Sequence, residues 1–284
     1  MTLAMAWVRR IDATEELVVA SDSRLRWGRS WDCCPKIVLL PRTDCVICFA
    51  GSTLYAYPLM LQMINAIGLY PASMNRGMGI EDLKGHTLKV FERMRLEIHD
   101  LPRPDGEEAP DTLFLLAGFS WREHKFKIWK LLYDPAIDSF TYQPHRRWNA
   151  AGDKLIALVG DEVKEAKRRL VVLLRARGRL LQGGFNMEPL EVLRDMIRDN
   201  HSDLIGGPPQ LVKLYRYMQV KPFGLYWPDR KSGVRTVMGR PLLQFEKPNC
   251  QILDPDTLDR LREPGGFTNA SSEIEADPRA AGTD

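Results

Sequence analysis

The sequence lacks the features that would place it in a membrane or in an oxidising compartment. No apolar run approaches the roughly 18 residues that a membrane-spanning helix needs. The opening segment, MTLAMAWVRRIDATEE, has an apolar stretch too short for a secretory signal, and its charges follow that stretch. Cysteines number five, an odd count that argues against a framework of disulfides. We therefore expect a reduced, cytoplasmic protein without a membrane partner.

Patterns for metal or nucleic-acid binding are also missing. The histidines show no HExxH spacing, and no second CxxC joins Cys45 and Cys48. These two cysteines lie in a strand-like run, where residues three apart point to opposite faces, so we expect two small core residues. The net charge is only +3, and the basic residues from Lys164 to Arg179 share their helix face with Glu162 and Glu165 and lack stacking aromatic residues. We expect no metal, no cofactor and no nucleic-acid partner.

What the chain does contain is a succession of strand-like and helix-like segments. Hydrophobic residues make up 44% of the chain, which is ample for a packed core. Apolar runs predict strands at residues 3–9, 17–21, 37–40, 45–50, 112–119, 126–132, 139–142 and 210–217. Apolar residues at helical spacing predict helices at residues 53–67, 80–98, 153–177 and 189–198. The residues alone thus indicate a mixed α/β chain, and no internal repeat is visible.

The carboxyl-terminal part has a different character. Residues 221–227 and 234–238, separated by the turn-forming PDRKSG, predict an added hairpin. From about Pro264 the chain is polar and has too few apolar residues to bury. We expect one domain over residues 1–262, in which residues 218–262 form the added hairpin region, and a disordered tail over residues 263–284.

The amino-terminal residues carry the strongest indication of chemistry. Thr2 directly follows Met1, so removal of Met1 would give one residue with both a hydroxyl nucleophile and a free α-amine. An α-amine has a pKa of about 7.7–8.0, so much of it is neutral at cellular pH and can accept the hydroxyl proton. A threonine at position 2 is informative only if the rest of the chain supplies the partners that such a nucleophile needs.

Several later segments occur in an order that supports such a site. They are SDSR, which contains Asp22; Lys36 before the run IVLL; FAG, which ends at Gly51 before a predicted helix; and RDNHS, which contains Asp199 and Ser202. Together with Thr2, this ordered set resembles the β-type subunits of proteasomes, within the N-terminal-nucleophile (Ntn) hydrolases. The sequence is most similar to the bacterial self-assembling relatives, the Anbu type and the two-ring peptidase that works with an unfoldase. The resemblance runs from Thr2 to about Tyr217.

The resemblance implies a fold and a set of catalytic roles. The fold is of the α+β class, a four-layer αββα sandwich. Thr2 matches the nucleophile, Asp22 the buried carboxylate that orients the site, and Lys36 the cation that touches both Asp22 and the Thr2 hydroxyl. The backbone N–H of Gly51 matches the group that binds the oxyanion. A further pair, Asp199 and Ser202, matches the residues that brace the amino-terminal amine.

Two further positions are candidates for substrate binding, and one departs from the family. Phe49, two residues before Gly51, matches the floor of the pocket for the residue that precedes the cut; packing in the core is an equally good interpretation. Thr53, near the start of the following helix, is the second candidate. The family has a serine in a Gly-Ser-Gly turn before its third helix, but the corresponding stretch here, residues 149–152, is Asn-Ala-Ala-Gly. This departure leaves the braced amine short of one partner.

The resemblance implies a threonine peptidase that works through an acyl-enzyme inside a homo-oligomeric ring. Its substrate would be a peptide or an unfolded protein, and an unfoldase is a candidate partner. Two alternatives stay open. A catalytically silent scaffold or binding module would be favoured by retained Met1 or by the missing serine. An amidase for small substrates on the same fold would be favoured by an open monomer or dimer.

Overall fold

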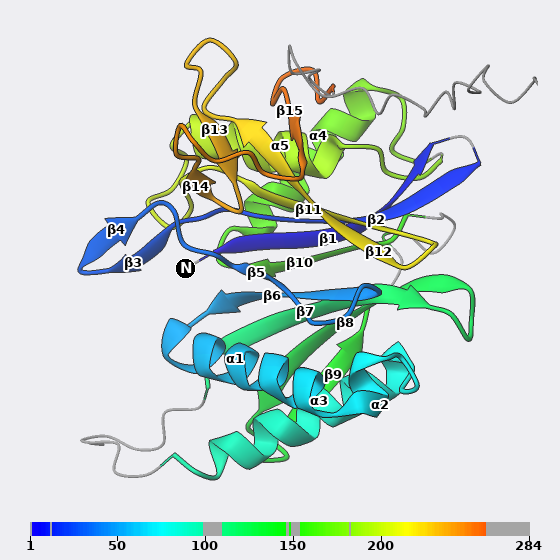
Figure 1. The fold of residues 1–284 in the computed structure, drawn as a ribbon. Helices are drawn as coiled ribbons and strands as arrows, with labels where there is room; N and C mark the ends of the chain where they lie inside the picture. The colour runs from blue at the N-terminus through cyan, green and yellow to red at the C-terminus, as the bar shows by residue number, and fades with distance from the viewer. Residues whose placement is uncertain are drawn as a thin grey trace, which may run out of the picture.

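The computed structural model describes residues 2–11, 13–98, 110–145, 148, 154–181 and 183–259. Its first large sheet draws strands from both ends of the chain (Figure 1). The order is β10-β1-β2-β11-β12-β13-β14, and β15 pairs with β12. The strands are β1 (Leu3–Ile11), β2 (Thr14–Ser21), β10 (Ile156–Gly160), β11 (Gln210–Tyr215), β12 (Gln219–Tyr226), β13 (Arg235–Val237), β14 (Arg240–Pro241) and β15 (Gln251–Leu253).

The second large sheet comes from the middle of the chain and has the order β5-β6-β7-β8-β9. Its strands are β5 (Ile37–Leu39), β6 (Cys45–Gly51), β7 (Thr112–Ser120), β8 (Lys125–Asp134) and β9 (Ser139–Pro144). A short separate hairpin consists of β3 (Leu25–Trp27) and β4 (Arg29–Trp31). The named strand pairs are antiparallel except for β12 with β15. The mixed α and β composition predicted from the sequence is therefore confirmed.

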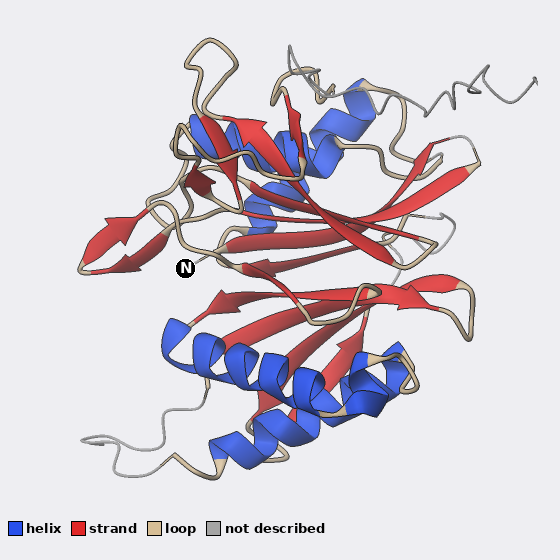
Figure 2. Cartoon of the chain, viewed as in Figure 1, coloured by secondary structure: helices blue, strands red, loops and turns tan. Residues whose placement is uncertain are grey.

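Helices cover the outer side of each sheet, as Figure 2 shows by colour. The helices α4 (Val163–Ala176) and α5 (Glu188–Arg198) lie on the first sheet. On the second sheet lie α1 (Thr53–Leu69), the short α2 (Pro71–Met74) and α3 (Ile80–Arg95). The predicted helices at residues 53–67, 80–98 and 189–198 thus match α1, α3 and α5 closely. Among the described residues, no helix combines the length and apolar composition that crossing a bilayer requires.

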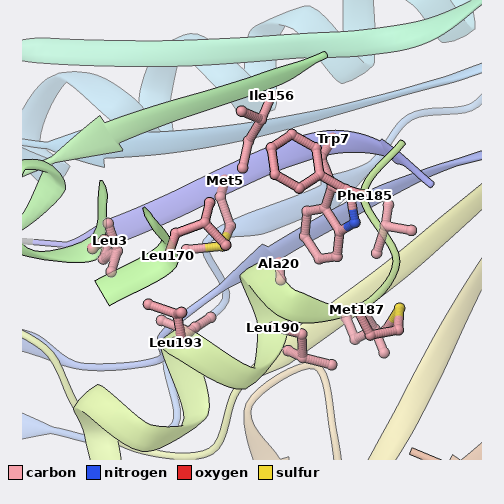
Figure 3. Packing of buried hydrophobic residues seen from close by; sticks show 14 of the residues in the cluster. Leu3, Met5, Trp7, Ala20, Ile156, Leu170, Phe185, Met187, Leu190 and Leu193 are labelled. Atoms are coloured by element: carbon pink, nitrogen blue, oxygen red, sulfur yellow. The ribbon is translucent and has the colours of Figure 1, made fainter. Parts of the chain in front are cut away.

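Buried side chains form three hydrophobic clusters that follow from the alternation of residues along the strands. In β1, Leu3, Met5 and Trp7 pack with residues of α4 and α5 (Figure 3). The intervening Ala4 and Ala6 pack between the two sheets with residues of β6 and β7. The third cluster contains residues of β6, β7, β8 and β9 together with residues of α1 and α3. Because successive side chains of a strand point to opposite faces, β1 contributes to two cores at once.

The predicted helix at residues 153–177 is wrong in its first part. Residues 156–160 instead form β10, which pairs with β1 in the register Trp7↔Ile156 to Leu3↔Gly160, and the helix begins only at Val163. Ile156 packs under the helices, whereas Ala157 and Val159 pack between the sheets, which is the alternation of a strand. The apolar positions of this segment fit a helical period as well, so spacing alone could not separate the two structures.

The added hairpin is confirmed and extends the first sheet. Residues of β12 and β13 pair in an antiparallel register that includes Gly224↔Val237, and β15 adds to the other side of β12. The expected tail at residues 263–284 lies outside the described residues.

Candidate active site

A buried ion pair joins the end of β2 to the start of β5. The Lys36 ammonium lies 2.8 Å from the carboxylate Oδ1 of Asp22, and both side chains are fully buried. Backbone N–H groups of Leu3, at 3.0 Å, and of Arg24 and Gly206, each at 3.1 Å, also donate to this carboxylate. The β1–β2 hairpin brings Asp22 beside Leu3 because the two strands are antiparallel and in register, with Ala4 opposite Ser21. The pair therefore lies next to the residue that follows Thr2.

Burial shifts both members of this pair toward their neutral forms. Burial raises the pKa of Asp22, and the Lys36 ammonium and the backbone N–H donors act against that shift. Burial likewise lowers the pKa of Lys36, opposed first by Asp22 and to a lesser extent by Cys34 and Asp161. A lysine with a lowered pKa exchanges its proton with a neighbouring hydroxyl more readily than an exposed lysine does.

Thr2 itself is buried and is held by the segment that follows β10. Its backbone N–H donates to Oδ2 of Asp161 at 2.7 Å, and the N–H of Asp161 donates to the carbonyl oxygen of Thr2 at 2.9 Å. Gly160 has a φ of +116°, and a Cβ at this position would lie 1.8 Å from the Thr2 carbonyl oxygen. Only glycine lets β10 approach the amino-terminal residue so closely.

The side-chain amide of Gln210 connects the segments that carry Asp22 and Lys36. Its Oε1 accepts hydrogen bonds from the N–H groups of Lys36, at 3.0 Å, and of Ile37, at 3.1 Å. Its Nε2 lies 2.7 Å from the carbonyl oxygen of Cys34, 3.1 Å from Ser23 Oγ and 3.3 Å from the carbonyl oxygen of Asp22. Gln210 is fully buried. The sequence offered one signal for it, a polar residue at the start of an apolar run.

Gly51 ends β6 immediately before α1. Its φ is +107°, and a Cβ there would lie 2.3 Å from the carbonyl oxygen of Asp111, so the turn requires glycine. Ser52 then precedes α1, and Thr53 is its half-buried first residue. In Figure 1 the amino terminus and the β6–α1 junction lie at the same end of the two sheets. The positive end of the α1 dipole is therefore at the Gly51 end of the helix.

The residues of the predicted brace of the amine, Asp199 and Ser202, make their hydrogen bonds to other residues. Asp199 directly follows α5, and its exposed carboxylate accepts a hydrogen bond from Arg169 of α4 at 2.6 Å. The hydroxyl of Ser202 accepts from the N–H of Leu204 at 3.1 Å. Within the described part of the chain, neither side chain hydrogen-bonds Thr2, which contacts Asp161 instead. Sequence reasoning missed Asp161 because it assigned this residue to a continuous helix. Residues 149–152, which correspond to the family's Gly-Ser-Gly turn, lie outside the described residues.

Phe49 is fully buried in the cluster under α1, where its ring lies edge-on to Tyr57 with 5.3 Å between centroids. Its neighbours Cys48 and Ala50 point the other way, into the core between the sheets. Phe49 thus packs in the core, as one of its two interpretations predicted. Tyr57 provides a link to the ion pair, because its hydroxyl donates to the carbonyl oxygen of Pro35, the residue before Lys36, at 3.1 Å.

The two cysteines of the CxxC lie on opposite faces of β6, Cys45 toward α1 and Cys48 between the sheets, as predicted. Burial raises the pKa of the Cys48 thiol to about 12. Among the described residues, no group of three or more histidines, cysteines or carboxylates is arranged to hold a metal ion. The sequence matches no known protein family and no curated protein.

Proposed function

We propose that the chain is an N-terminal threonine hydrolase that cleaves peptide bonds through an acyl-enzyme. The observation that supports this most strongly is the fully buried Asp22–Lys36 pair, whose carboxylate accepts a hydrogen bond from Leu3, the residue after Thr2. Removing two charges from water costs free energy that their attraction only partly offsets, so such a pair contributes little net stability. A buried pair of this kind beside a hydroxyl nucleophile has a direct chemical use, which is to supply a positive charge where an alkoxide forms.

The proposed reaction begins with removal of Met1. The α-amine of Thr2 accepts the proton of the threonine hydroxyl, and the oxygen attacks the substrate carbonyl carbon. The ammonium of Lys36 stabilises the developing alkoxide, and the backbone N–H of Gly51 stabilises the oxyanion of the tetrahedral intermediate. The protonated amine then gives its proton to the leaving nitrogen. Water, with the same amine as base, hydrolyses the remaining ester and restores Thr2.

The packing of the chain supports a four-layer αββα sandwich of the Ntn type as part of this proposal. Helices on the outer side of each sheet and a hydrophobic core between the sheets are what such a fold requires. A ring of identical subunits, an unfolded-protein substrate and an unfoldase partner follow from the resemblance to proteasome β-type subunits, and they belong to the proposal on that ground.

One observation favours a second candidate, a proteasome-like scaffold without peptidase activity. The Asp199–Ser202 pair, which braces the amine in the family that the sequence resembles, makes its hydrogen bonds to Arg169 and Leu204. If nothing else held the amine, the nucleophile would lack an oriented base.

The deciding experiment combines intact mass measurement with hydrolysis of a fluorogenic peptide panel that includes small acyl amides. We expect a mass without Met1 and turnover of peptides. Thr2→Ala should keep its melting temperature and lose at least about three orders of magnitude in rate. The matched control is Thr14→Ala, at an exposed position of β2, which should hydrolyse at the wild-type rate. Active protein that retains Met1 in full would rule out the mechanism, and preferential turnover of small amides would favour the amidase.

A further inference from the structure

We propose that Asp161 is the residue that holds the α-amine of Thr2 in the mature chain, in place of Asp199 and Ser202. This inference rests on the proposed function, because it concerns a chain whose first residue is Thr2. The carboxylate of Asp161 already lies 2.7 Å from the nitrogen of Thr2. That nitrogen becomes the α-amine when Met1 is removed, and it gains two further protons to donate when it is charged.

The backbone holds the carboxylate in this position. The last residue of β10, Gly160, pairs with Leu3, and the N–H of Asp161 donates to the carbonyl oxygen of Thr2 at 2.9 Å. Asp161 therefore contacts Thr2 through both its backbone and its side chain. These two contacts, one to the nitrogen and one to the carbonyl oxygen, orient the backbone of Thr2 from one residue.

The alternative brace is engaged with other groups. Arg169 donates to Asp199 at 2.6 Å and also to Glu165 at 2.8 Å, so Asp199 belongs to a charge network between α4 and α5. The imidazole of His201 extends that network, since its Nε2 lies 3.7 Å from Glu162 and its Nδ1 lies 3.5 Å from Arg169. A move of Asp199 away from α4 would break its contact with Arg169.

A carboxylate in direct contact changes the chemistry of the amine. Among the described residues, the charged groups at the amino-terminal segment include Asp161 from the β10–α4 turn, Asp22 from the end of β2 and Lys36 from the start of β5. Asp22 and Lys36 offset each other, because they form a pair at 2.8 Å. The negative charge of Asp161, 2.7 Å from the nitrogen, stabilises the protonated amine, so the amine pKa is higher than it would be at the same site without that charge.

A raised pKa of the amine changes the pH dependence of the rate in a predictable direction. Only the neutral amine can accept the hydroxyl proton, so the rate rises as the pH passes upward through the amine pKa. Wild-type protein then works below its full rate at pH 7. Asp161→Asn keeps an oxygen acceptor in the same place but removes the charge, so the neutral amine forms at lower pH. A change of one pKa unit corresponds to a tenfold change in the neutral fraction well below the pKa.

The test uses the full chain from Thr2 onward, released from a removable amino-terminal fusion, so that it does not depend on natural removal of Met1. The pKa of the Thr2 amine is measured from the pH dependence of its acetylation by acetic anhydride, followed by peptide mass spectrometry. We expect a value above the ordinary range of about 7.7–8.0 in the wild type and a value within it in Asp161→Asn. Asp203→Asn, at an exposed carboxylate paired with Arg26, is the matched control and should leave the amine pKa unchanged.

Equal amine pKa values in wild type and Asp161→Asn would overturn the inference, and so would a shift in Asp199→Asn alone. A melting curve for each variant separates these outcomes from loss of the fold. The readout does not require hydrolysis. A chain that shows the pKa shift but cleaves no peptide would contradict the proposed function and leave the role of Asp161 standing. An active chain without the pKa shift would contradict the role of Asp161 and leave the proposed function standing. In an active chain, Asp161→Asn should increase the rate at pH 7, relative to its own maximum, by several fold.

Discussion

The side-chain oxygen of Gln210 accepts a hydrogen bond from the backbone N–H of Lys36 at 3.0 Å, in a fully buried site. This contact ties the catalytic candidate to a strand that lies far from it in the sequence. The same oxygen also accepts from Ile37, and the amide nitrogen donates to the carbonyl oxygen of Cys34. The side chain of Gln210 thus supplies hydrogen bonds that a neighbouring strand would otherwise supply. It does so where β11 of the first sheet meets the start of β5 in the second sheet.

Gln210→Leu should destabilise the protein and reduce hydrolysis together. The leucine removes the partners of the N–H groups of Lys36 and Ile37 and of the carbonyl of Cys34, and each unsatisfied buried group costs about 1–3 kcal/mol. We expect the free energy of unfolding in urea to fall by roughly 3–5 kcal/mol. Gln62→Leu, at an exposed position of α1, is the control and should change it by less than about 0.5 kcal/mol. Equal unfolding midpoints for the two variants would contradict this role of Gln210.

Lys36→Ala should abolish hydrolysis, and Lys36→Arg should not restore it. The alanine leaves the Asp22 carboxylate buried without its counter-charge, which costs about 3–5 kcal/mol of stability. A planar guanidinium is too large for a site built around a compact ammonium. Lys164→Ala, on the exposed side of α4, should keep the wild-type rate. Steady-state hydrolysis of a model peptide, measured below each variant's melting temperature, is the check; a wild-type rate for Lys36→Ala would show that Lys36 has no catalytic role.

Gly160→Ala should prevent assembly of the site. The added methyl group would meet the Thr2 carbonyl oxygen at 1.8 Å, and the left-handed φ of +116° is itself strained for alanine. Gly85→Ala in α3 is the matched control, because no atom lies within 4 Å of the new Cβ, and it should stabilise the helix by up to about 1 kcal/mol. Thermal unfolding of the two variants distinguishes a local clash from a general sensitivity to alanine. A Gly160→Ala protein that melts with the wild type and hydrolyses peptides would contradict the close approach of β10 to Thr2.

His145 should make the fold less stable in mild acid. Its Nε2 is buried without a hydrogen-bond partner among the described residues, and burial, with a smaller effect of the Lys167 charge, lowers its pKa from 6.5 to about 4. The unfolded chain therefore binds this proton at higher pH than the folded chain does. Stability is complete above pH 6.5 and is lost progressively as the pH falls toward about 4.

The measurement is the melting temperature as a function of pH for His145→Phe, which cannot bind the proton. The difference between wild type and variant should grow in the variant's favour between pH 6.5 and about 4. His124→Asn is the control, since His124 is exposed and asparagine tolerates its φ of 51°. Parallel curves for wild type and His145→Phe over this range would refute the assignment.

The fold was predictable where the length and spacing of the apolar residues have only one interpretation. The strands within residues 3–21 and 37–51 are short, continuous apolar runs, and α3 carries Leu83 and Phe91 at helical spacing, so the predicted ends lie within a few residues of the observed ones. The segment from Ile156 to Gly160 failed because its apolar residues fit both periods, and only pairing with β1 decides in favour of a strand. Tertiary contact, which a single sequence does not display, made that choice.

The sequence predicted the ion pair of the candidate site but not the residues that hold this site in place. Asp22 and Lys36 lie in a recognisable order along the chain and meet in the structure. Asp161 and Gln210 lie in segments whose local patterns suggest only a helix and a strand. Their importance depends on which residues they face, Thr2 for Asp161 and Lys36 for Gln210, and those are properties of the folded chain.

The hydrogen bonds of Gly206 to Asp22 and of Lys36 to Gln210 join residues 184 and 174 positions apart. A ribosome that has translated Thr2, Asp22 and Lys36 must still add most of the domain before the partners of those residues exist. During that interval the nascent chain carries its candidate nucleophile, Thr2, without the groups that hold the Asp22–Lys36 pair in place. Long-range closure of this kind is slow to form and is completed late in folding. The candidate site is thus completed only after residue 210 has been synthesised, and until then the proposed hydrolase stays inactive toward itself and toward the other nascent chains around it.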